Sequence, residues 1–342
     1  MARQRKFRFP KVRLTVPRQT KSLFRSLTTL NSFGLLTTAK AANPMGRTIE
    51  ISDFGTNPGQ LKMFIYTPER LVPRNAPLIV VLHGCGQYAE SFASNSGWIA
   101  LANHLRLPLL LPEQVARNNA SRCFNWYRPS DTQRGHGEAM SVRQMIRTSI
   151  KRFSSDQRQV FVVGLSAGGA LTAALLAAYP TVFNAGAVVA GMPVGSARNA
   201  TSALLHMHHG NPLTTRETLI SAITSKQKIT QRPRKWPRIS IWHGERDRAV
   251  DPANGAALAV QWSGIHGFGN APSFDDVAAS GIRRRTWGAA KRPLVEWWTL
   301  PEMGHGFPAD AAIPGGGRAA FGVVDAGISG AYHIARFWGL EI

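Results

Sequence analysis

Apolar and polar positions along the chain alternate in a way that predicts strands and helices in turn. Uninterrupted apolar runs typical of strands covered on both faces occur at 78–82 (LIVVL), 160–163 (VFVV) and 185–190 (AGAVVA). Positions 138–153 carry apolar residues at helical spacing, and a run of good helix formers follows residue 163. Buried strands that alternate with helices predict a doubly wound, mostly parallel sheet with helices on both faces, and thus an α/β protein.

The other expected elements continue this alternation, with one interruption. Further strands are predicted at 47–52, 61–66, 108–112, 238–242 and 294–300, and further helices at 92–105, 252–262 and 327–338. Residues 192–235 are rich in Gly, Ser, Asn and Thr and carry only a short helical signal at 215–223, so we predict a lid-like insertion there. We see no internal repeat, and we expect one α/β domain at 47–342 after a leader at 1–46.

One turn carries a chemical motif. Gly164-Leu165-Ser166-Ala167-Gly168 joins a strand to a helix without a spacer and matches G-x-S-x-G, in which a serine sits on a tight bend above a parallel sheet. A side chain at Gly164 or Gly168 would collide with its neighbours in so close a bend. The N-terminus of the following helix also favours an anion there. Ser166 is therefore the candidate nucleophile, the alternative being an ordinary βα turn.

A serine nucleophile needs a base that is itself oriented by a carboxylate. In α/β-hydrolases the acid and then the histidine follow the serine along the chain, each on a loop after a strand. The loops HGERDRAVDP after 238–242 and PEMGHGF after 294–300 match this order. We predict Asp247 as the acid and His305, which glycines flank, as the base.

Other residues in these loops compete for the same roles. Glu245 comes earlier in the acid loop, nearer the strand end, whereas Asp251 precedes Pro252 and is typical of a helix N-cap. His83 and His243 both follow strands as His-Gly, and we expect their rings to bond loop backbone.

The histidines at 206, 208 and 209 invite a metal-site interpretation, but they fall in an expected irregular loop without a Cys or carboxylate partner. We predict no metal site and no cofactor.

An acyl-transfer site also needs two N–H groups aimed at the developing negative charge. One is expected from Ala167, the residue after the nucleophile. The other is expected from the glycine-rich loop His83-Gly84-Cys85-Gly86, and we predict Cys85 as the donor. The alternative for this loop is a plain tight turn.

Charge is distributed unevenly along the chain. The formal net charge is +22, and ten Lys and Arg residues fall in the first forty positions, which hold no Asp or Glu. Such a leader is able to contact a polyanion or a granule surface, or to be solvated without a partner. It also resembles an export signal ending in Ala39-Lys40-Ala41, or a transit peptide, and composition does not choose among these. No stretch approaches the ~20 apolar residues of a membrane span.

Several segments taken together resemble one enzyme family. HGCGQ, RCFNWY, GLSAGGA, YPTVFNAGAVVAGMPVG, HGERDRAVDP and GMGHGFP stand in order over residues 47–341 and resemble the polyhydroxybutyrate (PHB) depolymerase family esterases, relatives of feruloyl and acetylxylan esterases. The resemblance implies an α/β-hydrolase fold with the triad Ser166, Asp247 and His305. It also implies that Cys85 and Cys123, whose spacing alone leaves free thiols or a disulfide open, form a disulfide, and that Trp126 lies near an acyl-binding cleft.

The resemblance implies a serine esterase that acts on short-chain hydroxyalkanoate polyester or oligomers. We expect it to be secreted, with a cytoplasmic location left open by the weak leader. The segment after His305 reads GFPAD, where aromatic-rich forms are usual, and no substrate-binding domain or Thr-rich linker is seen to follow. We therefore expect amorphous polymer, oligomers or small esters. Two alternatives remain: a feruloyl or acetylxylan type of carbohydrate esterase, and a non-catalytic polyanion- or granule-binding protein that acts through its basic leader. We expect no specific nucleic-acid partner.

Overall fold

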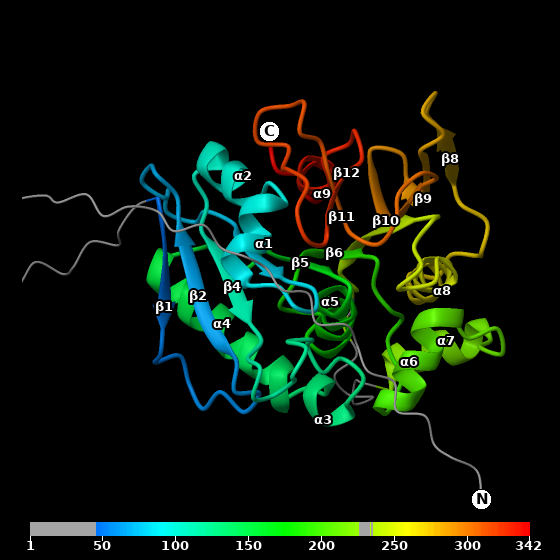
Figure 1. Ribbon diagram of the computed structural model, residues 1–342, viewed down its shortest axis with the longest axis horizontal. Helices are drawn as coiled ribbons and strands as arrows, with labels where there is room; N and C mark the ends of the chain where they lie inside the picture. Colours follow the sequence, from blue (N-terminus) through cyan, green and yellow to red (C-terminus); the bar gives the residue numbers. More distant parts are fainter. Residues whose placement is uncertain (1–45, 226–232, 234) are drawn as a thin grey trace, which may run out of the picture. The chain divides into compact units, whose positions relative to one another are not determined.

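One ten-stranded sheet organises the molecule, with strand order β1-β2-β4-β3-β5-β6-β7-β10-β9-β8 (Figure 1). The computed structural model describes residues 46–225, 233 and 235–342, and all of them belong to the unit 43–342. The predicted leader at 1–46 lies outside the described residues except for Gly46. The strands of this sheet are β1 (Arg47–Ile51), β2 (Lys62–Thr67), β3 (Leu78–Leu82), β4 (Leu109–Glu113), β5 (Val160–Leu165), β6 (Ala185–Val189), β7 (Arg238–Gly244), β8 (Phe274–Val277), β9 (Arg283–Ala289) and β10 (Arg292–Leu300).

The middle of the sheet is parallel and both edges are antiparallel. Neighbouring strands from β4 through β3, β5, β6 and β7 to β10 run parallel, whereas β1 and β2 at one edge and β9 and β8 at the other pair antiparallel. The mostly parallel α/β sheet expected from the sequence is confirmed. The carboxyl ends of β5, β7 and β10, after which the predicted nucleophile, acid and base follow, therefore lie at the same edge.

Helices cover both faces of the sheet, and each face has its own apolar core. The helices α4 (Gly137–Phe153), α5 (Ala167–Ala178) and α8 (Ala253–Ile265) contribute to one core, and α1 (Ala89–Asn95), α2 (Trp98–Leu105) and α9 (Gly330–Trp338) contribute to the other. Strand β3 supplies both, since Val80 belongs to the first core and Ile79 and Val81 to the second. This alternation follows from the two-residue period of a strand and explains why the run reads as apolar throughout.

Apart from short elements, the structure differs from the expected elements in three places. The helix expected at 92–105 is two helices, because the chain leaves helical geometry at Gly97, which has a φ of 87° and is the N-cap of the second one. The insertion between β6 and β7 holds α6 (Ala200–His209) and α7 (Arg216–Thr224), so the irregular loop expected around the three histidines is wrong. A capping box between Asn199 and Ser202 begins α6.

The third difference is the edge formed by β8 and β9, which was not predicted. The sequence RRRTWGA of β9 lacks an apolar alternation. Its arginines instead find carboxylates on neighbouring strands, since Arg283 pairs with Asp275 of β8 and Arg284 pairs with Glu296 of β10. The short elements α3 (Pro129–Thr132), β11 (Phe307–Ala309) and β12 (Val323–Asp325) complete the described part. None of the described helices has the length and apolar character needed to cross a membrane.

Candidate active site

The turn that carries Ser166 is as tight as its glycines indicate. Ser166 follows β5 directly with φ 57° and ψ −118°, a strained conformation for a residue with a side chain. A Cβ on Gly164 would lie 2.2 Å from the carbonyl oxygen of Gly168, and one on Gly168 would lie 2.5 Å from the carbonyl oxygen of His83. The serine is only partly buried, and among the described residues its hydroxyl makes no hydrogen bond. The bend therefore presents an available hydroxyl.

The predicted acid and base meet in the structure. His305 Nδ1 lies 2.7 Å from Asp247 Oδ2, and the imidazole is 26% exposed while the carboxylate is fully covered. Because Asp247 accepts at Nδ1, the neutral ring carries its proton there and leaves Nε2 as the basic nitrogen. Nε2 makes no hydrogen bond to Ser166 in the described part of the chain. Such catalytic bonds are often long in enzymes without substrate.

Asp247 is held by more than His305. Its Oδ1 accepts the backbone N–H groups of Ala249 and Val250, each at 2.9 Å. His243 Nε2 lies 3.4 Å from Oδ2 and 2.9 Å from the carbonyl oxygen of Val250. Burial by itself raises the pKa of Asp247, but the hydrogen bonds from His243 and His305 outweigh it and leave that pKa well below its usual range. The carboxylate is therefore ionised and fixed in direction.

The competing residues in the acid loop have other positions. Asp251 Oδ1 accepts the N–H of Ala253 at 2.8 Å, a structural contact at the start of α8, although the N-cap of that helix is Pro252 and not Asp251 as expected. Glu245 is exposed, and its backbone N–H bonds the carbonyl of Leu300. A Cβ on Gly244 would lie 2.2 Å from the carbonyl oxygen of Met303, so the acid loop lies directly against the loop that carries His305.

The loop at residues 83–87 leaves one N–H without an acceptor. Gly84 N donates to Gln87 Oε1 at 2.7 Å, Gly86 N donates to Ser121 O at 2.8 Å and Gln87 N donates to Gly84 O at 3.3 Å. Within the described residues, the N–H of Cys85 has no acceptor. The N–H of Ala167, at the first position of α5, has none either. These are the two donors predicted for the oxyanion hole.

Gln87 was not predicted to matter, although it stands in the HGCGQ segment. Its side chain is buried, and besides accepting from Gly84 its Nε2 donates to Phe321 O at 2.6 Å. It thus ties the loop at 83–87 to a segment 234 residues further along the chain. The contact is visible only in three dimensions.

The two cysteines form a disulfide, as the family resemblance implied. Cys85 and Cys123 are joined with a Cα–Cα distance of 4.2 Å. The bond links the loop at 83–87 to the RCFNWY segment, which carries Trp126.

Trp126 packs against a small apolar cluster made of Ala170, Met192 and Val250. Ala170 lies one turn of α5 beyond Ser166, and Val250 is the residue whose N–H bonds Asp247. The indole therefore lies against residues adjacent to both the serine turn and the acid loop.

A buried carboxylate that sequence analysis missed supports the same segment. Glu138, at the start of α4, has no exposed surface and accepts from Asn125 N and from Gln114 Nε2, the latter at 2.6 Å. Asn125 Nδ2 donates to it as well, at 2.8 Å. Burial raises the pKa of Glu138 to about 8, although these hydrogen bonds act in the opposite direction. The network fixes the residue that precedes Trp126.

The remaining histidines that the sequence singled out have structural contacts. His83 is buried, bonds Gly84 O through Nδ1 and accepts from Gln114 N at Nε2, as expected for a ring bonded to loop backbone; burial lowers its pKa to about 4. His206 bonds Ser196 O from helix α6, while His208 and His209 are exposed.

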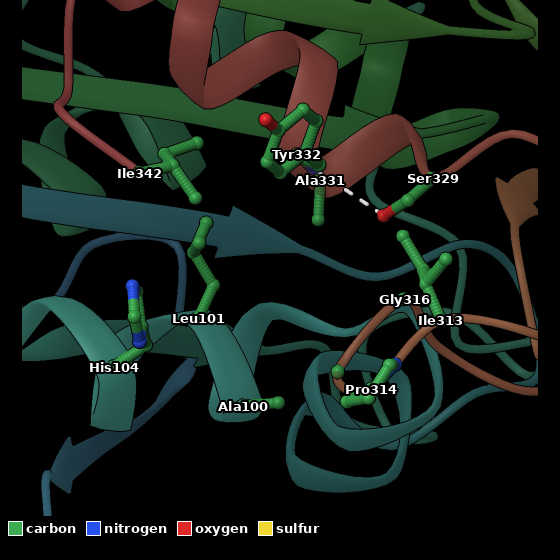
Figure 2. A pocket seen from close by; sticks show the side chains of 11 residues that line it. Ala100, Leu101, His104, Ile313, Pro314, Gly316, Ser329, Ala331, Tyr332 and Ile342 are labelled. Carbon is green, nitrogen blue, oxygen red and sulfur yellow. Dashed lines mark hydrogen bonds between the residues drawn. The ribbon is translucent and has the colours of Figure 1, made fainter.

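A cavity of about 230 Å³ lies elsewhere, between α2, α9 and residues 313–316 (Figure 2). Leu101 and His104 from α2 face Ala331 and Tyr332 from α9 across it. Ser166, Asp247 and His305 do not line it, so it is separate from the candidate site.

The sheet order, the serine turn after β5 and the Asp247–His305 pair define the class. The protein is an α/β-hydrolase. The acetyl xylan esterase from Aspergillus awamori shares this fold with a TM-score of 0.73 at 21% identity, over 86% of this chain and 100% of that one.

The family follows from the sequence comparisons. The family model described as "Esterase PHB depolymerase" matches residues 61–284, and the chain belongs to this family of ester hydrolases. It is 37% identical to the poly(3-hydroxyalkanoate) depolymerase C of Paucimonas lemoignei over 308 residues, which cover 85% of this chain and 70% of that enzyme. It is 28% identical to an acetylxylan esterase of Coprinopsis cinerea over 278 residues, 78% of this chain and 70% of that one, and 26% identical to feruloyl esterase B of Talaromyces funiculosus over 280 residues, 77% and 74%.

Proposed function

We propose that this enzyme hydrolyses short-chain hydroxyalkanoate polyester or its oligomers through an acyl-enzyme on Ser166. The observation that carries the proposal is the 2.7 Å bond between Asp247 and His305, on loops at the sheet edge where the strained serine turn lies. The substrate class rests on the 37% identity to a depolymerase, which exceeds the 26–28% identity to the two carbohydrate esterases.

The reaction divides into two halves. In the first, His305 Nε2 takes the Ser166 proton while Oγ attacks the ester carbonyl, and the N–H groups of Cys85 and Ala167 receive the resulting oxyanion. The proton then passes from His305 to the departing alcohol, and the serine remains acylated. In the second half a water molecule repeats the sequence, which releases the acid and restores the serine.

The apolar cluster beside the turn supports an acyl-binding role for Trp126. The indole, Met192 and Val250 form an apolar surface next to the atoms that would react, as a short alkyl side chain on the acyl group requires. A feruloyl ester would have to place its bulky planar group on the same surface, so we expect it to bind less well than a short alkyl acyl group.

Labelling with a fluorophosphonate tests the nucleophile. The probe should modify Ser166, as mass spectrometry of the peptide that contains it would report, and Ser166→Ala should abolish both labelling and nitrophenyl butyrate hydrolysis. Activity that survives in Ser166→Ala would rule out the mechanism.

An ester panel tests the substrate class. Hydroxybutyrate oligomers and nitrophenyl esters of two to eight carbons should be hydrolysed faster than acetylated xylan or methyl ferulate. A preference for the carbohydrate esters would instead support the alternative acetylxylan or feruloyl function.

The disulfide supports a location outside the cytoplasm, because such bonds persist in oxidising compartments. We propose that the enzyme is secreted; two free thiols in protein isolated from its native host would contradict this.

The basic leader is proposed to contact a polymer granule or another polyanion. Binding that persists after deletion of residues 1–41 would exclude the leader as the contact.

A further inference from the structure

A second feature of the chain, unrelated to the triad, is a cavity lined by three arginines. It has a volume of about 290 Å³ and lies where the loop before α4, the outer face of α4 and the residue after α5 meet. Its lining residues are Arg134, Gly135, Met140, Arg143, Gln144, Arg147 and Tyr179. No carboxylate belongs to this lining.

The three guanidinium groups stand out because they line one cavity and no carboxylate lines it with them. Arg158, Arg246, Arg283 and Arg284 each form an ion pair with an Asp or Glu. Arg134, Arg143 and Arg147 take part in none of the ion pairs of the described part. Arg143 is partly buried and makes no hydrogen bond there either. The cavity therefore brings three positive charges together, with no carboxylate among its described lining residues.

The rim of the cavity is fixed by its own contacts. Arg134 Nη1 donates to Ala178 O at 3.1 Å, and its guanidinium lies over the Tyr179 ring at 5.1 Å from the centroid. The Tyr179 hydroxyl accepts the N–H of Gly135 at 2.8 Å. The side chain of Gln144 is engaged with Thr56 and Asn57, so it does not compete for a ligand.

The positive charges in the cavity repel one another. The pKa of Arg143 is lowered by burial, then by the charge of Arg147, while Tyr179 acts in the opposite direction and Arg134 lowers it again. An anion among the three groups would relieve this repulsion. Guanidinium groups offer paired N–H donors that match the oxygens of a phosphate, and three full charges favour a dianion over a carboxylate.

We propose that Arg134, Arg143 and Arg147 form a binding site for a phosphate-class oxyanion, either free phosphate or a phosphomonoester headgroup. The site is separate from the catalytic centre. Tyr179 follows the last residue of α5 and Ser166 precedes the first, so a helix of 12 residues, about 18 Å at 1.5 Å per residue, lies between them (Figure 1). The proposal does not depend on the proposed substrate.

Calorimetric titration of inorganic phosphate into the full chain, with chloride keeping the ionic strength constant, tests the site. Wild-type protein should bind one phosphate, and Arg143→Gln should weaken the affinity at least tenfold. Arg147→Gln, which changes an exposed side chain, should weaken it too and guards against misfolding of the first variant. Arg70→Gln, which removes an exposed arginine outside the cavity, should leave the affinity within twofold of wild type.

Three outcomes would overturn the proposal: no phosphate binding by wild-type protein, unchanged binding in both cavity variants, or an equal loss in Arg70→Gln. Ester hydrolysis at the wild-type rate in Arg143→Gln would show that the variant is folded. Vesicles of phosphatidic acid, compared with vesicles of phosphatidylcholine, distinguish the two sources of the ligand. Competition with phosphate for the wild-type site would indicate a headgroup, and absence of competition would indicate free phosphate.

Discussion

The acid loop and the two turns proposed to face the substrate differ in how far their polar groups are satisfied. In the acid loop the Asp247 carboxylate is fully covered and receives two backbone N–H groups and two histidine rings. In the turns at 83–87 and 164–168, the N–H groups of Cys85 and Ala167 and the Ser166 hydroxyl have no partner among the described residues. The molecule thus fixes the groups that orient and leaves unpaired the groups proposed to react.

The comparison shows that the backbone strain is concentrated at the serine turn and not in the acid loop. Strain and unpaired donors at the serine turn persist only because the surroundings over-determine them, here through close glycine contacts and a helix packed on the sheet. We call the acid loop with Asp247 the fixed side, and the turns at 83–87 and 164–168 the available side. Each of the following predictions changes one of the two.

The largest effect is expected at the available side. Ser166→Ala removes the attacking oxygen, and kcat should fall on the order of 10⁶-fold, because the remaining groups have no nucleophile to activate. Steady-state hydrolysis of nitrophenyl butyrate measures this, with an unchanged unfolding midpoint as the control. A loss of less than about tenfold would contradict the assignment.

The next effect is expected at the fixed side. Asp247→Asn keeps the volume, but the amide no longer accepts from His305 Nδ1 with a full charge, so the ring loses its orientation and its favoured tautomer. The rate should fall on the order of 10⁴-fold. Asp251→Asn serves as the matched control, since that side chain only begins α8 and should leave kcat nearly unchanged. Equal losses in both variants would show that the loop, not the Asp247 charge, is what matters.

The sequence offered a reason to prefer Asp247 to Asp251 as the acid, whereas much of the surroundings of both residues could not be read from it. Pro252 after Asp251 indicated an N-cap at Asp251; in the structure Pro252 is the N-cap, and Asp251 stands just before it and accepts the N–H of Ala253. The run LIVVL predicted a strand with the observed bounds, because a strand that is buried on both faces is apolar throughout. Gln87 and Glu138 were missed because their partners, Phe321 and Asn125, carry no local signal that pairs them.

Helix α6 and strand β9 escaped prediction for related reasons. Leu204 and Leu205 of α6 are exposed, 58% and 56%, so the helix shows no clear apolar face. In β9, consecutive arginines conceal a strand whose charges are neutralised by partners on β8 and β10. Periodicity detects burial against the core, and it fails where an element is held by caps or by ion pairs.

The disulfide between Cys85 and Cys123 joins the loop at 83–87 to the segment that carries Trp126, and removing it should destabilise the protein. The disulfide closes a segment of 38 residues, which a loop-entropy argument values at about 4 kcal/mol. The double variant Cys85→Ser/Cys123→Ser should lose about this much free energy of unfolding in urea, with a smaller effect on activity than the Asp247 variant. A loss below about 1 kcal/mol would show that the Gly86–Ser121 hydrogen bond and its neighbours hold the loop by themselves.

The smallest effect tests whether the side chain of Gln87 holds the N–H of Cys85 in position. Gln87→Ala removes the acceptor of Gly84 N and the donor to Phe321 O, so the Cys85 N–H loses the support that aims it. Misplaced by about 1 Å, such a donor costs on the order of 10² in kcat with little change in KM, because it acts on the oxyanion and not on the bound ester. Gln87→Glu keeps the acceptor for Gly84 and, as the neutral acid favoured beside the Phe321 carbonyl, keeps a donor to it, so it should recover part of the rate. Gln133→Ala, at an exposed glutamine, is the matched control. A change confined to KM, or no recovery in Gln87→Glu, would mean that the Gly84 bond does not position the donor.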